Sequence, residues 1–488
     1  MDEPLSRRPI APSPAAAERQ EALAAELRRR AARRLGIAPE RIAWDQPLTA
    51  LGLDSLSAVE IQQEIESELG LAVALSSLLE GAGVRQLAAE ALAGPAAGRW
   101  TDAERAAAPA PPPAHPVPGA ERSEFPLSYG QRALWFLQQL APASAAYHIA
   151  VAVRVRGDLD AAALRAALQA IAGRHPALRT TFHADAADGT PGPVQRVHAA
   201  MAVDFSCAEA PGAGDEELAG QLWEAARRPF ALASGPLLRV ALWRRAPDDH
   251  AMVLAVHHLV ADFASLALVF AELVRLYPHR EAAAALAAPA VHYADYVRWQ
   301  GERLAAAGES LWGFWRATLG GPLPQLDLPT DRPRPAVATD HGALRVRAME
   351  PELSGRVQAL ALASGATLFQ TLLAAFMALL DRSGGRHDLL VGCPVAGRGA
   401  PELAGVVGYF VNPVVVRATP DDFAGRGLPG GAAAPAAAAA MEEAAAGGAS
   451  FRRFLHLLGR RAVAAFEHQE LPFALLAERL QPQRDPGR

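Results

Sequence analysis

The chain has 488 residues, of which 51% are hydrophobic and 20% are charged, a composition typical of globular proteins with roughly two to four domains. The formal net charge of −5 leaves no basic footprint for nucleic acid. Two cysteines, Cys207 and Cys393, exclude a disulfide framework and suit a reducing compartment. Met1 to Pro4 lacks the basic start of a signal peptide, and the longest apolar tract, residues 368–380, is too short to span a bilayer. We therefore expect a cytoplasmic protein that binds neither nucleic acid nor a membrane.

Simple patterns divide the first part of the chain. Residues 1–17, rich in Pro and Ala, predict a flexible leader. Residues 18–35 carry leucines at helical spacing and predict a first helix, and residues 84–92 predict a short later one. Residues 106–120 contain six prolines and predict a semi-rigid spacer. The spacer is expected to separate a helical N-terminal domain from everything after Arg122.

A Gly-Leu-Asp-Ser-Leu segment (52–56) stands before the second predicted helix. Residues 57–70 form that helix, with one apolar stripe and acidic residues on its other faces. Ser55 therefore falls at a helix start, where free backbone N–H groups and the positive end of the helix dipole favour a phosphate ester. The alternative is that Asp54 or Ser55 only caps the helix.

The chain after Arg122 alternates strand-like and helix-like segments, which predicts an α/β fold. The predicted strands are residues 147–155, 237–243, 252–257, 389–394 and 411–417. The predicted helices are residues 160–173, 266–277, 291–304, 311–319 and 367–380. Residues 425–450 are a low-complexity Ala/Gly stretch and predict a surface excursion.

Two adjacent histidines, His257 and His258, stand where one predicted strand ends. Side chains alternate along a strand, so the two imidazoles should point in opposite directions. Opposed histidines do not converge on a metal ion, which argues against a metal site. The remaining interpretations are a histidine pair satisfied by backbone groups and a general base, or amine-positioning group, for acyl transfer. Asp262 is expected to hold the following loop by an ion pair or a hydrogen bond at the helix start, and Ser265 to cap the helix.

The N-terminal pattern resembles an acyl or peptidyl carrier domain. The resemblance covers residues 18–94: a first helix, a long loop, the Gly-Leu-Asp-Ser-Leu helix, Ser77-Leu78-Leu79-Glu80 and a short last helix. In that family the serine of this motif carries 4′-phosphopantetheine, which implies a covalent attachment at Ser55. Such an arm is a swinging thioester tether, which replaces a bimolecular encounter by a local concentration.

The rest of the chain resembles the condensation domain of nonribosomal peptide synthetases. Eight segments follow the order of that family's motifs, beginning with Pro126 to Leu137 and Arg174 to Phe182, and including His257 to Ser265, which matches the active-site motif. The other five are Tyr293 to Gln300, Val391 to Arg398, Val407 to Asn412, His468 to Phe473 and Arg484 to Arg488.

This resemblance implies a small all-α four-helix carrier domain followed by an α/β condensation domain of two chloramphenicol-acetyltransferase-like lobes in a V. The expected boundaries are a leader at 1–17, the carrier at 18–95, a Pro/Ala-rich linker at 96–121 and the condensation domain at 122–488. Carrier-bound donor and acceptor are expected to enter a tunnel between the lobes from opposite ends and to meet at His258.

The implied reaction is attack of an aminoacyl-carrier amine on the acyl thioester held at Ser55, forming an amide in nonribosomal peptide or polyketide–peptide biosynthesis of secondary metabolites such as antibiotics. Its implied partners are a phosphopantetheinyl transferase, an upstream acyl-loading or polyketide module and a downstream adenylation–thiolation module. His258 is the expected catalytic residue. His257, Asp262 and Ser265 are expected to be structural.

Further motif residues are expected to make ion pairs or hydrogen bonds and not to act in catalysis: Arg174, His175, Arg179, His292 and His468. Three tryptophans at helical spacing, Trp299, Trp312 and Trp315, are expected to pack in the core. Arg332 and Arg334 are candidate partners for Asp262.

The chain departs from the family pattern at two places. Phe263 stands where the family usually has Gly directly after the motif aspartate. A positive φ there would strain Phe263, whereas a negative φ would leave its ring free to narrow the tunnel. Full-length relatives also continue beyond the Arg484-Asp485 motif, so the condensation domain is expected to be C-terminally truncated.

Two other functions remain open. An epimerisation domain also follows a carrier and shares the histidine motif, although Val407 to Asn412 and His468 to Phe473 favour condensation. A non-catalytic module that docks another enzyme or carrier is the alternative from a different class, supported by Phe263 and the truncated end. A heterocyclisation domain would carry aspartates in place of the histidine pair.

Overall fold

The structure, a computed structural model, describes residues 14–53, 57–58, 61–62, 65, 69, 71, 73–79, 81–93, 124–187, 189, 191–278, 289–333, 335, 342–385, 387–423 and 451–481. Ser55, the predicted linker at 96–121, the low-complexity stretch at 425–450 and the Arg484-Asp485 motif lie outside these residues.

The N-terminal part is helical. Its elements are α1 (Pro14–Leu35), η1 (Pro39–Arg41), η2 (Leu48–Leu51), α3 (Leu75–Leu79) and α4 (Val84–Ala93). Helix α1 packs against α4, and their contact is tied by Arg85, which bonds Glu21 and Asp45. Helix α1 begins at Pro14, four residues before the predicted first helix at 18–35, because the Ala-rich run after Pro14 favours helix.

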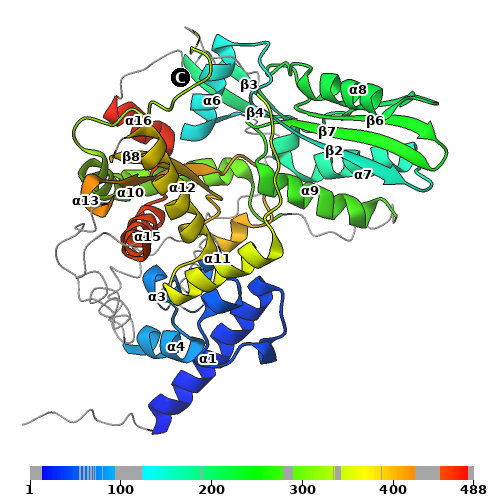
Figure 1. Ribbon diagram of the computed structural model, residues 1–488. Coiled ribbons are helices and arrows are strands. Elements are labelled where there is room, and N and C mark those ends of the chain that lie inside the picture. The colour runs from blue at the N-terminus through cyan, green and yellow to red at the C-terminus, as the bar shows by residue number, and fades with distance from the viewer. Residues whose placement is uncertain are drawn as a thin grey trace, which may run out of the picture.

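The first lobe is built on a four-stranded sheet in the order β2-β7-β6-β5. Figure 1 shows α7 and α9 on one face of this sheet and α8 on the other. The strands are β2 (His148–Arg156), β5 (Asp204–Glu209), β6 (Leu238–Ala246) and β7 (Asp249–His257). The helices are α6 (Tyr129–Leu140), α7 (Ala161–Arg174), α8 (Asp215–Arg227) and α9 (Phe263–Leu276). A three-stranded sheet, β1-β4-β3, extends the lobe; its strands are β1 (Glu124–Pro126), β3 (Thr180–Asp185) and β4 (Pro191–Val197), with η5 (Pro176–Arg179) before β3.

The second lobe packs helices around the antiparallel pair β8 and β9. Its elements are α10 (Tyr293–Leu319), α11 (Pro351–Ala363), α12 (Leu368–Gly384), β8 (Leu389–Val395), η7 (Pro401–Leu403), β9 (Asn412–Ala418), α13 (Pro420–Phe423), α15 (Phe451–Glu467) and α16 (Phe473–Leu480). The predicted helices at 291–304 and 311–319 form one continuous helix, α10, because the Ala-rich stretch between them has high helix propensity.

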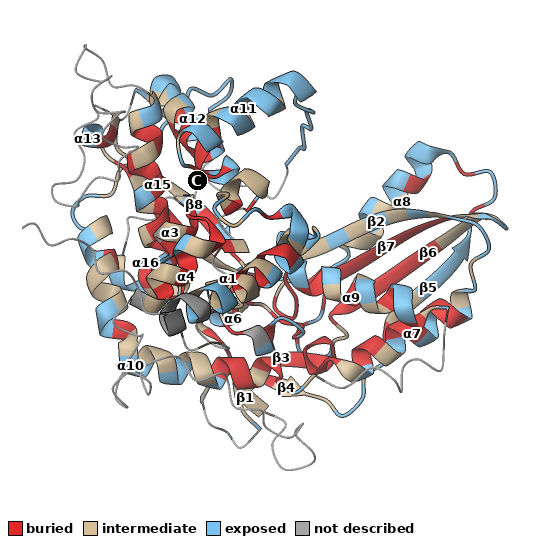
Figure 2. Ribbon diagram, turned by 90° about the horizontal axis from the view of Figure 1, so that it is seen from below, coloured by how far each residue is buried: buried red, intermediate tan, exposed pale blue. Residues whose placement is uncertain are grey.

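The two lobes diverge in Figure 2, each around its own buried residues. The core of the first lobe also takes in the segment from Val406 to Phe410, which follows β8 in the chain, so the second half of the sequence closes the first lobe. The helical N-terminal part lies against the second lobe, where α3 packs on α15 (Figures 1 and 2).

In the part of the chain that the structure describes, no single helix meets the length and apolarity of a membrane span; the bent pair α11 and α12, at 102° to each other, meets them jointly.

Candidate functional site

Strand β7 places His257 at its last position, and His258 follows directly. The strand is buried along most of its length because β2 and β6 flank it and helices cover both faces. The strand ends at His257, opposite His148 of β2. His258 comes next, and its backbone N–H donates to the carbonyl of Tyr147 at 2.8 Å, which fixes where the chain leaves the sheet.

His257 is fully buried and held in one tautomer. Its Nδ1 accepts the backbone N–H of Leu259 at 3.1 Å, so the ring proton lies on Nε2 and is donated to Gln138 Oε1 at 3.3 Å. Its ring meets those of His148 and Phe230 edge to face. Burial lowers the pKa of His257 to about 3, with smaller contributions from His148 and His258, so this imidazole is neutral near pH 7.

His258 is only partly buried, and its tautomer is the opposite of that of His257, with the lone pair on Nε2. Its Nδ1 lies 2.8 Å from the carbonyl oxygen of Ala261. A carbonyl can only accept, so Nδ1 carries the proton and Nε2 keeps its lone pair. The ring of Tyr409 contacts the imidazole edge to face, with centroids 4.8 Å apart. His258 therefore has the tautomer that a base acting through Nε2 requires.

Asp262 is the N-cap of α9 and is 3% exposed. One carboxylate oxygen accepts the backbone N–H and the hydroxyl of Ser265, each at 2.7 Å, and the guanidinium of Arg398 at 2.8 Å. The other oxygen accepts the backbone N–H of Phe410 at 3.1 Å. Two of these donors belong to α9 and two to the segment after β8, so Asp262 joins these two parts of the chain. We call this set of contacts the Asp262 junction.

The partner of Asp262 is Arg398, at the end of one of the family's motifs. Arg398 also donates to the carbonyls of Leu403 and Val406 and lies over the ring of Phe410 at 4.1 Å. The prediction that Arg332 pairs with Asp262 was wrong. Arg332 is exposed, whereas Arg398 is bonded to the buried carboxylate and to two backbone carbonyls. Arg334, the other candidate, lies outside the described residues.

Ser265 is not the helix cap that we expected. It is the third residue of α9, and its hydroxyl accepts the backbone N–H of Gly408 at 3.0 Å and lies 2.9 Å from the carbonyl oxygen of Gly408. The Asp262 carboxylate takes the capping role because it reaches the N–H of the third helical residue. Ser265 instead joins α9 to the segment that closes the first lobe.

A second set of buried polar contacts lies beside this junction, and sequence reasoning did not find it. The hydroxyl of Tyr293 donates to the carbonyl of Tyr409 at 2.6 Å and lies 2.9 Å from Ser128 Oγ, at the cap of α6. Burial raises the pKa of Tyr293 well above its usual value. Gly408 packs so closely on Tyr293 that a Cβ there would overlap the ring. The only signal in the sequence was that these residues fall within the family's motifs.

Phe263 is the first helical residue of α9 and does not have a positive φ. The aromatic residue in place of the usual glycine is therefore not strained. Its side chain is 74% exposed, so the ring projects from the helix start beside the Asp262 junction.

The other motif residues make structural contacts, as expected. Arg174 and His175 both bond Glu272 at 2.9 Å, and His292 caps α10. His468 stacks on Phe314 with centroids 3.7 Å apart. Arg179 donates to the carbonyl of His198. Trp315 is 1% exposed in the core of the second lobe, while Trp299 and Trp312 pack at the edges of the cores.

The predicted attachment residue, Ser55, lies outside the described residues, but its flanks are described. Gly52 has a positive φ of 94° at the end of η2, Leu53 is buried, and helical residues resume at Ser57 and Ala58. Position 55 is thus two residues before Ser57 and shortly after a tight turn. A phosphate ester just ahead of a helical segment fits the chemistry of free helix N–H groups.

Two family models match parts of this chain. A family model described as the condensation domain matches residues 121–488, and one described as a phosphopantetheine attachment site matches residues 25–91. The second match indicates a covalently attached 4′-phosphopantetheine.

Among curated proteins, the chain is 35% identical over 454 residues to the isonitrile lipopeptide synthase of Mycobacterium tuberculosis, which covers 91% of this chain and 16% of that protein. It is 36% identical over 387 residues to phosphinothricin tripeptide synthetase PhsC of Streptomyces viridochromogenes, covering 78% of this chain and 33% of that protein. The chain therefore spans only a small part of the length of these relatives.

Among solved structures, the X-domain from teicoplanin biosynthesis has 27% identity and a TM-score of 0.64, covering 78% of this chain and 77% of that one. The first condensation domain of the calcium-dependent antibiotic synthetase has 23% identity and a TM-score of 0.56, with 73% of this chain and 78% of that chain covered, and shows the same fold. The predicted fold, a helical carrier region followed by a chloramphenicol-acetyltransferase-like α/β domain of two lobes, is confirmed. The chain belongs to the condensation-domain family and is joined on its N-terminal side to a phosphopantetheine attachment domain.

Proposed function

We propose that this chain forms an amide bond between an acyl group held as a thioester at Ser55 and the amine of an aminoacyl group on a second carrier, in nonribosomal peptide or polyketide–peptide assembly. The observation that carries the proposal is the tautomer of His258. Its Nδ1 proton is fixed by the carbonyl of Ala261, which leaves Nε2 as an acceptor on a partly buried ring, in a domain of the condensation family.

The phosphopantetheine supplies the thiol that holds the acyl group. The step forms a C–N bond and breaks the C–S bond of the thioester. An α-amino group has an ordinary pKa of about 7.7–8.0, so part of it is neutral near pH 7 and a weak base suffices. His258 Nε2 accepts the proton that the amine loses and returns it to the leaving sulfur, so the imidazole ends the cycle neutral.

The surrounding residues hold His258 and do not touch the reacting groups. His257 anchors the strand end through Gln138, and Asp262 anchors the following turn through Arg398. Because these contacts are buried on both sides of the turn, the direction of His258 Nε2 is set before substrates arrive. Such positioning contributes to rate as much as the proton transfer itself.

The predicted partners follow from the same chemistry. A phosphopantetheinyl transferase modifies Ser55, an upstream acyl-loading or polyketide module delivers the donor, and a downstream adenylation–thiolation module presents the amine. Two free cysteines, one exposed and one buried, suit the reducing cytoplasm in which we place the reaction.

The test is an intact-mass assay with the full chain. Ser55 is loaded with acyl-pantetheine, an aminoacylated downstream carrier is added, and both proteins are weighed over time. We expect the acyl mass to leave this chain and appear on the second carrier. Ser55→Ala should block loading, whereas Ser57→Ala, two residues along, should load and transfer normally.

The other outcomes separate the alternatives. Inversion of the loaded substrate without any mass transfer would favour an epimerisation domain. Normal loading with neither transfer nor inversion would favour a non-catalytic docking module. Loading of Ser55→Ala would show that the donor attachment is elsewhere.

A further inference from the structure

Tyr409 contacts the imidazole of His258 but comes from a distant part of the sequence. The two rings meet edge to face with centroids 4.8 Å apart. His258 follows β7 of the first lobe, whereas Tyr409 stands three residues before Asn412, where β9 of the second lobe begins. A ring packed against an imidazole limits the rotation of that imidazole. The orientation of His258 therefore depends on where the second half of the chain places Tyr409.

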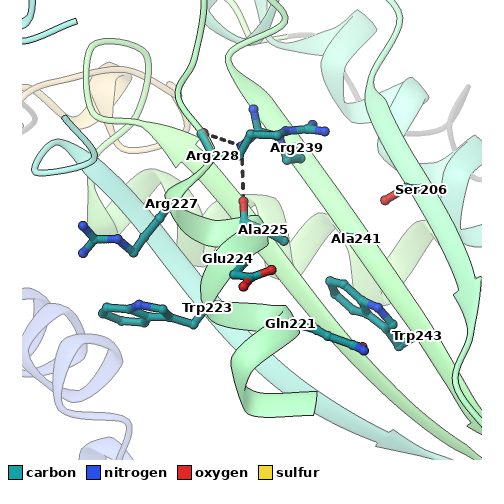
Figure 3. Close-up of a pocket in the computed structure, with 10 residues that line it drawn as sticks. All are labelled: Ser206, Gln221, Trp223, Glu224, Ala225, Arg227, Arg228, Arg239, Ala241 and Trp243. Atoms are coloured by element: carbon teal, nitrogen blue, oxygen red, sulfur yellow. Dashed lines mark hydrogen bonds between the residues drawn. The ribbon is translucent and has the colours of Figure 1, made fainter. Parts of the chain in front are cut away.

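The backbone that carries His258 is already fixed from the side of the sheet. On β6, Arg239 is 5% exposed and donates to the carbonyls of Ala225 and Arg228 at the end of α8 (Figure 3). On β2, His148 Nδ1 lies 2.9 Å from a carbonyl oxygen of the same helix. Both neighbours of β7 are thus tied to α8. The freedom that remains at the end of β7 is that of the His258 side chain.

One hydrogen bond is too weak to hold this side chain by itself. Among the described residues, only Ala261 forms a hydrogen bond with the imidazole of His258. A hydrogen bond between neutral groups contributes about 0.5–1.5 kcal/mol, because water competes for both groups. The χ2 torsion of histidine is broad and adds little preference of its own. The ring of Tyr409 supplies the steric restriction that the hydrogen bond lacks.

The backbone around Tyr409 is held by three buried side chains. The carbonyl of Tyr409 accepts the hydroxyl of Tyr293 at 2.6 Å. The N–H one residue before it donates to Ser265 Oγ at 3.0 Å, and the N–H one residue after it donates to the Asp262 carboxylate at 3.1 Å. Tyr293, Ser265 and Asp262 are all buried. The Asp262 junction therefore fixes the backbone of Tyr409 as well as the start of α9.

Helix α6 limits where the Tyr409 ring can lie. A Cβ at Gly130 would stand 2.6 Å from Cε1 of Tyr409 and 3.3 Å from Cδ1, so the ring occupies the space that the glycine leaves free. Helix α6 is itself tied to the histidine turn, because Gln131 Nε2 donates to the carbonyl of Leu259 at 2.9 Å. Tyr409 thus contacts both α6 and His258.

The hydroxyl of Tyr409 is not part of this packing. It forms no hydrogen bond with any residue that the structure describes. Burial raises the pKa of Tyr409 to about 12, so the hydroxyl is neutral near pH 7. The ring is therefore the part of the side chain that acts on His258, and a phenylalanine ring would serve equally.

We propose that Tyr409 is a positioning residue, whose ring holds the imidazole of His258 in the orientation from which Nε2 accepts the proton of the amine. This inference rests on the proposed function, since it concerns the same reaction. It gives the chain that leads into the second lobe a part in orienting a group of the first lobe.

The orientation of His258 is measured without any reaction by nitrogen NMR of the full chain labelled at histidine. His258→Ala assigns the signals of His258 by their loss. A fixed ring gives one pair of signals, from a protonated Nδ1 and a bare Nε2. Tyr409→Ala should broaden these signals or draw them together, and Tyr409→Phe should preserve them. Tyr277→Ala is the matched control, because it removes another half-buried tyrosine ring from the same core, and it should also preserve them.

The single-turnover transfer rate is the second readout. With acyl-loaded chain and an excess of aminoacyl carrier, Tyr409→Ala should slow transfer by about 10–100-fold at saturating carrier, because the base is misplaced. The carrier concentration that gives half the maximal rate should not change. Tyr409→Phe should transfer at the rate of the protein without a substitution.

A further variant moves the ring without removing it. Gly130→Ala places a methyl group against the Tyr409 ring, so it should alter the His258 signals and slow transfer. In the Tyr409→Ala background, Gly130→Ala should have no further effect on the signals, because no ring remains to be displaced.

The proposal is overturned if the His258 signals of Tyr409→Ala equal those of Tyr277→Ala, or if Tyr409→Phe disturbs them as strongly as Tyr409→Ala. It is also overturned if Gly130→Ala disturbs them equally with and without the Tyr409 ring. If the protein without a substitution transfers no acyl group, the proposed function fails, and the NMR signals alone decide whether Tyr409 orients His258.

Discussion

At the scale of single residues, one buried carboxylate holds the candidate site together. Asp262 accepts four hydrogen bonds, two from Ser265 within α9 and two from Arg398 and Phe410, far along the chain. Breaking a buried ion pair leaves the remaining charge without compensation.

We therefore expect Asp262→Asn to lower the free energy of unfolding by about 3–5 kcal/mol, because Arg398 loses its acidic partner in a site where both side chains are almost fully buried. Denaturant unfolding followed by fluorescence measures this. Glu309→Gln removes the partner of Arg479 at the surface, where the pair is exposed, and should leave stability nearly unchanged. Equal effects of the two substitutions would contradict the junction.

Phe263 gives a second test at this scale, of backbone conformation. Phe263→Ala and Phe263→Gly both remove the exposed ring, so their difference reports the backbone alone. Because Phe263 begins α9 without a positive φ, the alanine variant should be more stable than the glycine variant by about 0.5–1 kcal/mol in thermal unfolding. A more stable glycine variant would mean that the position needs a left-handed conformation.

At the scale of elements, three segments pack closely where the lobes meet: the segment after β8, the start of α10 and helix α6. The segment after β8 approaches the start of α10 at Gly408, and it approaches α6 at Gly130, where an added Cβ would lie 2.6 Å from the ring of Tyr409. These contacts explain why glycine stands at both positions: a methyl group has no room there.

Gly408→Ala should therefore destabilise the protein by about 1–3 kcal/mol, through overlap with the Tyr293 ring. Gly405→Ala is the matched control, since an added Cβ at position 405 meets nothing within 4 Å. Chemical denaturation measures the free energy of unfolding of both variants. If Gly408→Ala is as stable as Gly405→Ala, the contact between this segment and α10 is looser than described.

Elements with a local pattern were predicted well. Strand β7 and helix α9 follow from an apolar run that changes to helical periodicity at the histidines, and α7 follows from its apolar spacing after Asp160. The sheet β1-β4-β3 was missed because its strands are short and mix polar with apolar residues. The sequence predicted two helices where the structure has the single helix α10, because the pattern of large apolar residues is interrupted by alanines.

The candidate site was predictable only where its groups are neighbours in the chain. His257, His258 and Asp262 lie within six residues, so the strand-to-helix pattern placed them together. Arg398 pairs with Asp262 across 136 residues, and Tyr293 meets Ser128 across 165. No local pattern reports such contacts, since they depend on how the lobes fold back on each other.

At the scale of the whole molecule, buried and half-buried histidines link stability to pH. Burial lowers the pKa of five of them: His148, His183, His198, His257 and His292. In the unfolded chain these groups take up protons near pH 6.5, whereas in the folded protein they resist protonation. Their contribution to stability is therefore full above about pH 6.5 and is lost as pH falls, for His257 down to about 3.

We expect the free energy of unfolding to fall as the pH drops below 6.5, and His257, whose pKa in the folded protein is about 3, contributes a slope that approaches about 1.4 kcal/mol per pH unit between its two pKa values. His257→Gln removes one titrating group and should flatten the slope by about that amount. Guanidinium unfolding at a series of pH values measures both slopes. Parallel profiles for the two proteins would show that His257 is protonated as easily in the folded state as in the unfolded one.

The whole account depends most on His258 acting through Nε2 in amide formation, and a single-turnover transfer rate tests this most directly. Acyl-loaded full chain is mixed with an excess of aminoacyl carrier, and transfer is timed by intact mass. His258→Ala should slow transfer by roughly 10²–10⁴-fold without changing loading at Ser55. His387→Ala, at an exposed histidine of the second lobe, should transfer at the same rate as the protein without a substitution. A His258→Ala rate equal to that of the His387→Ala control would contradict the assignment.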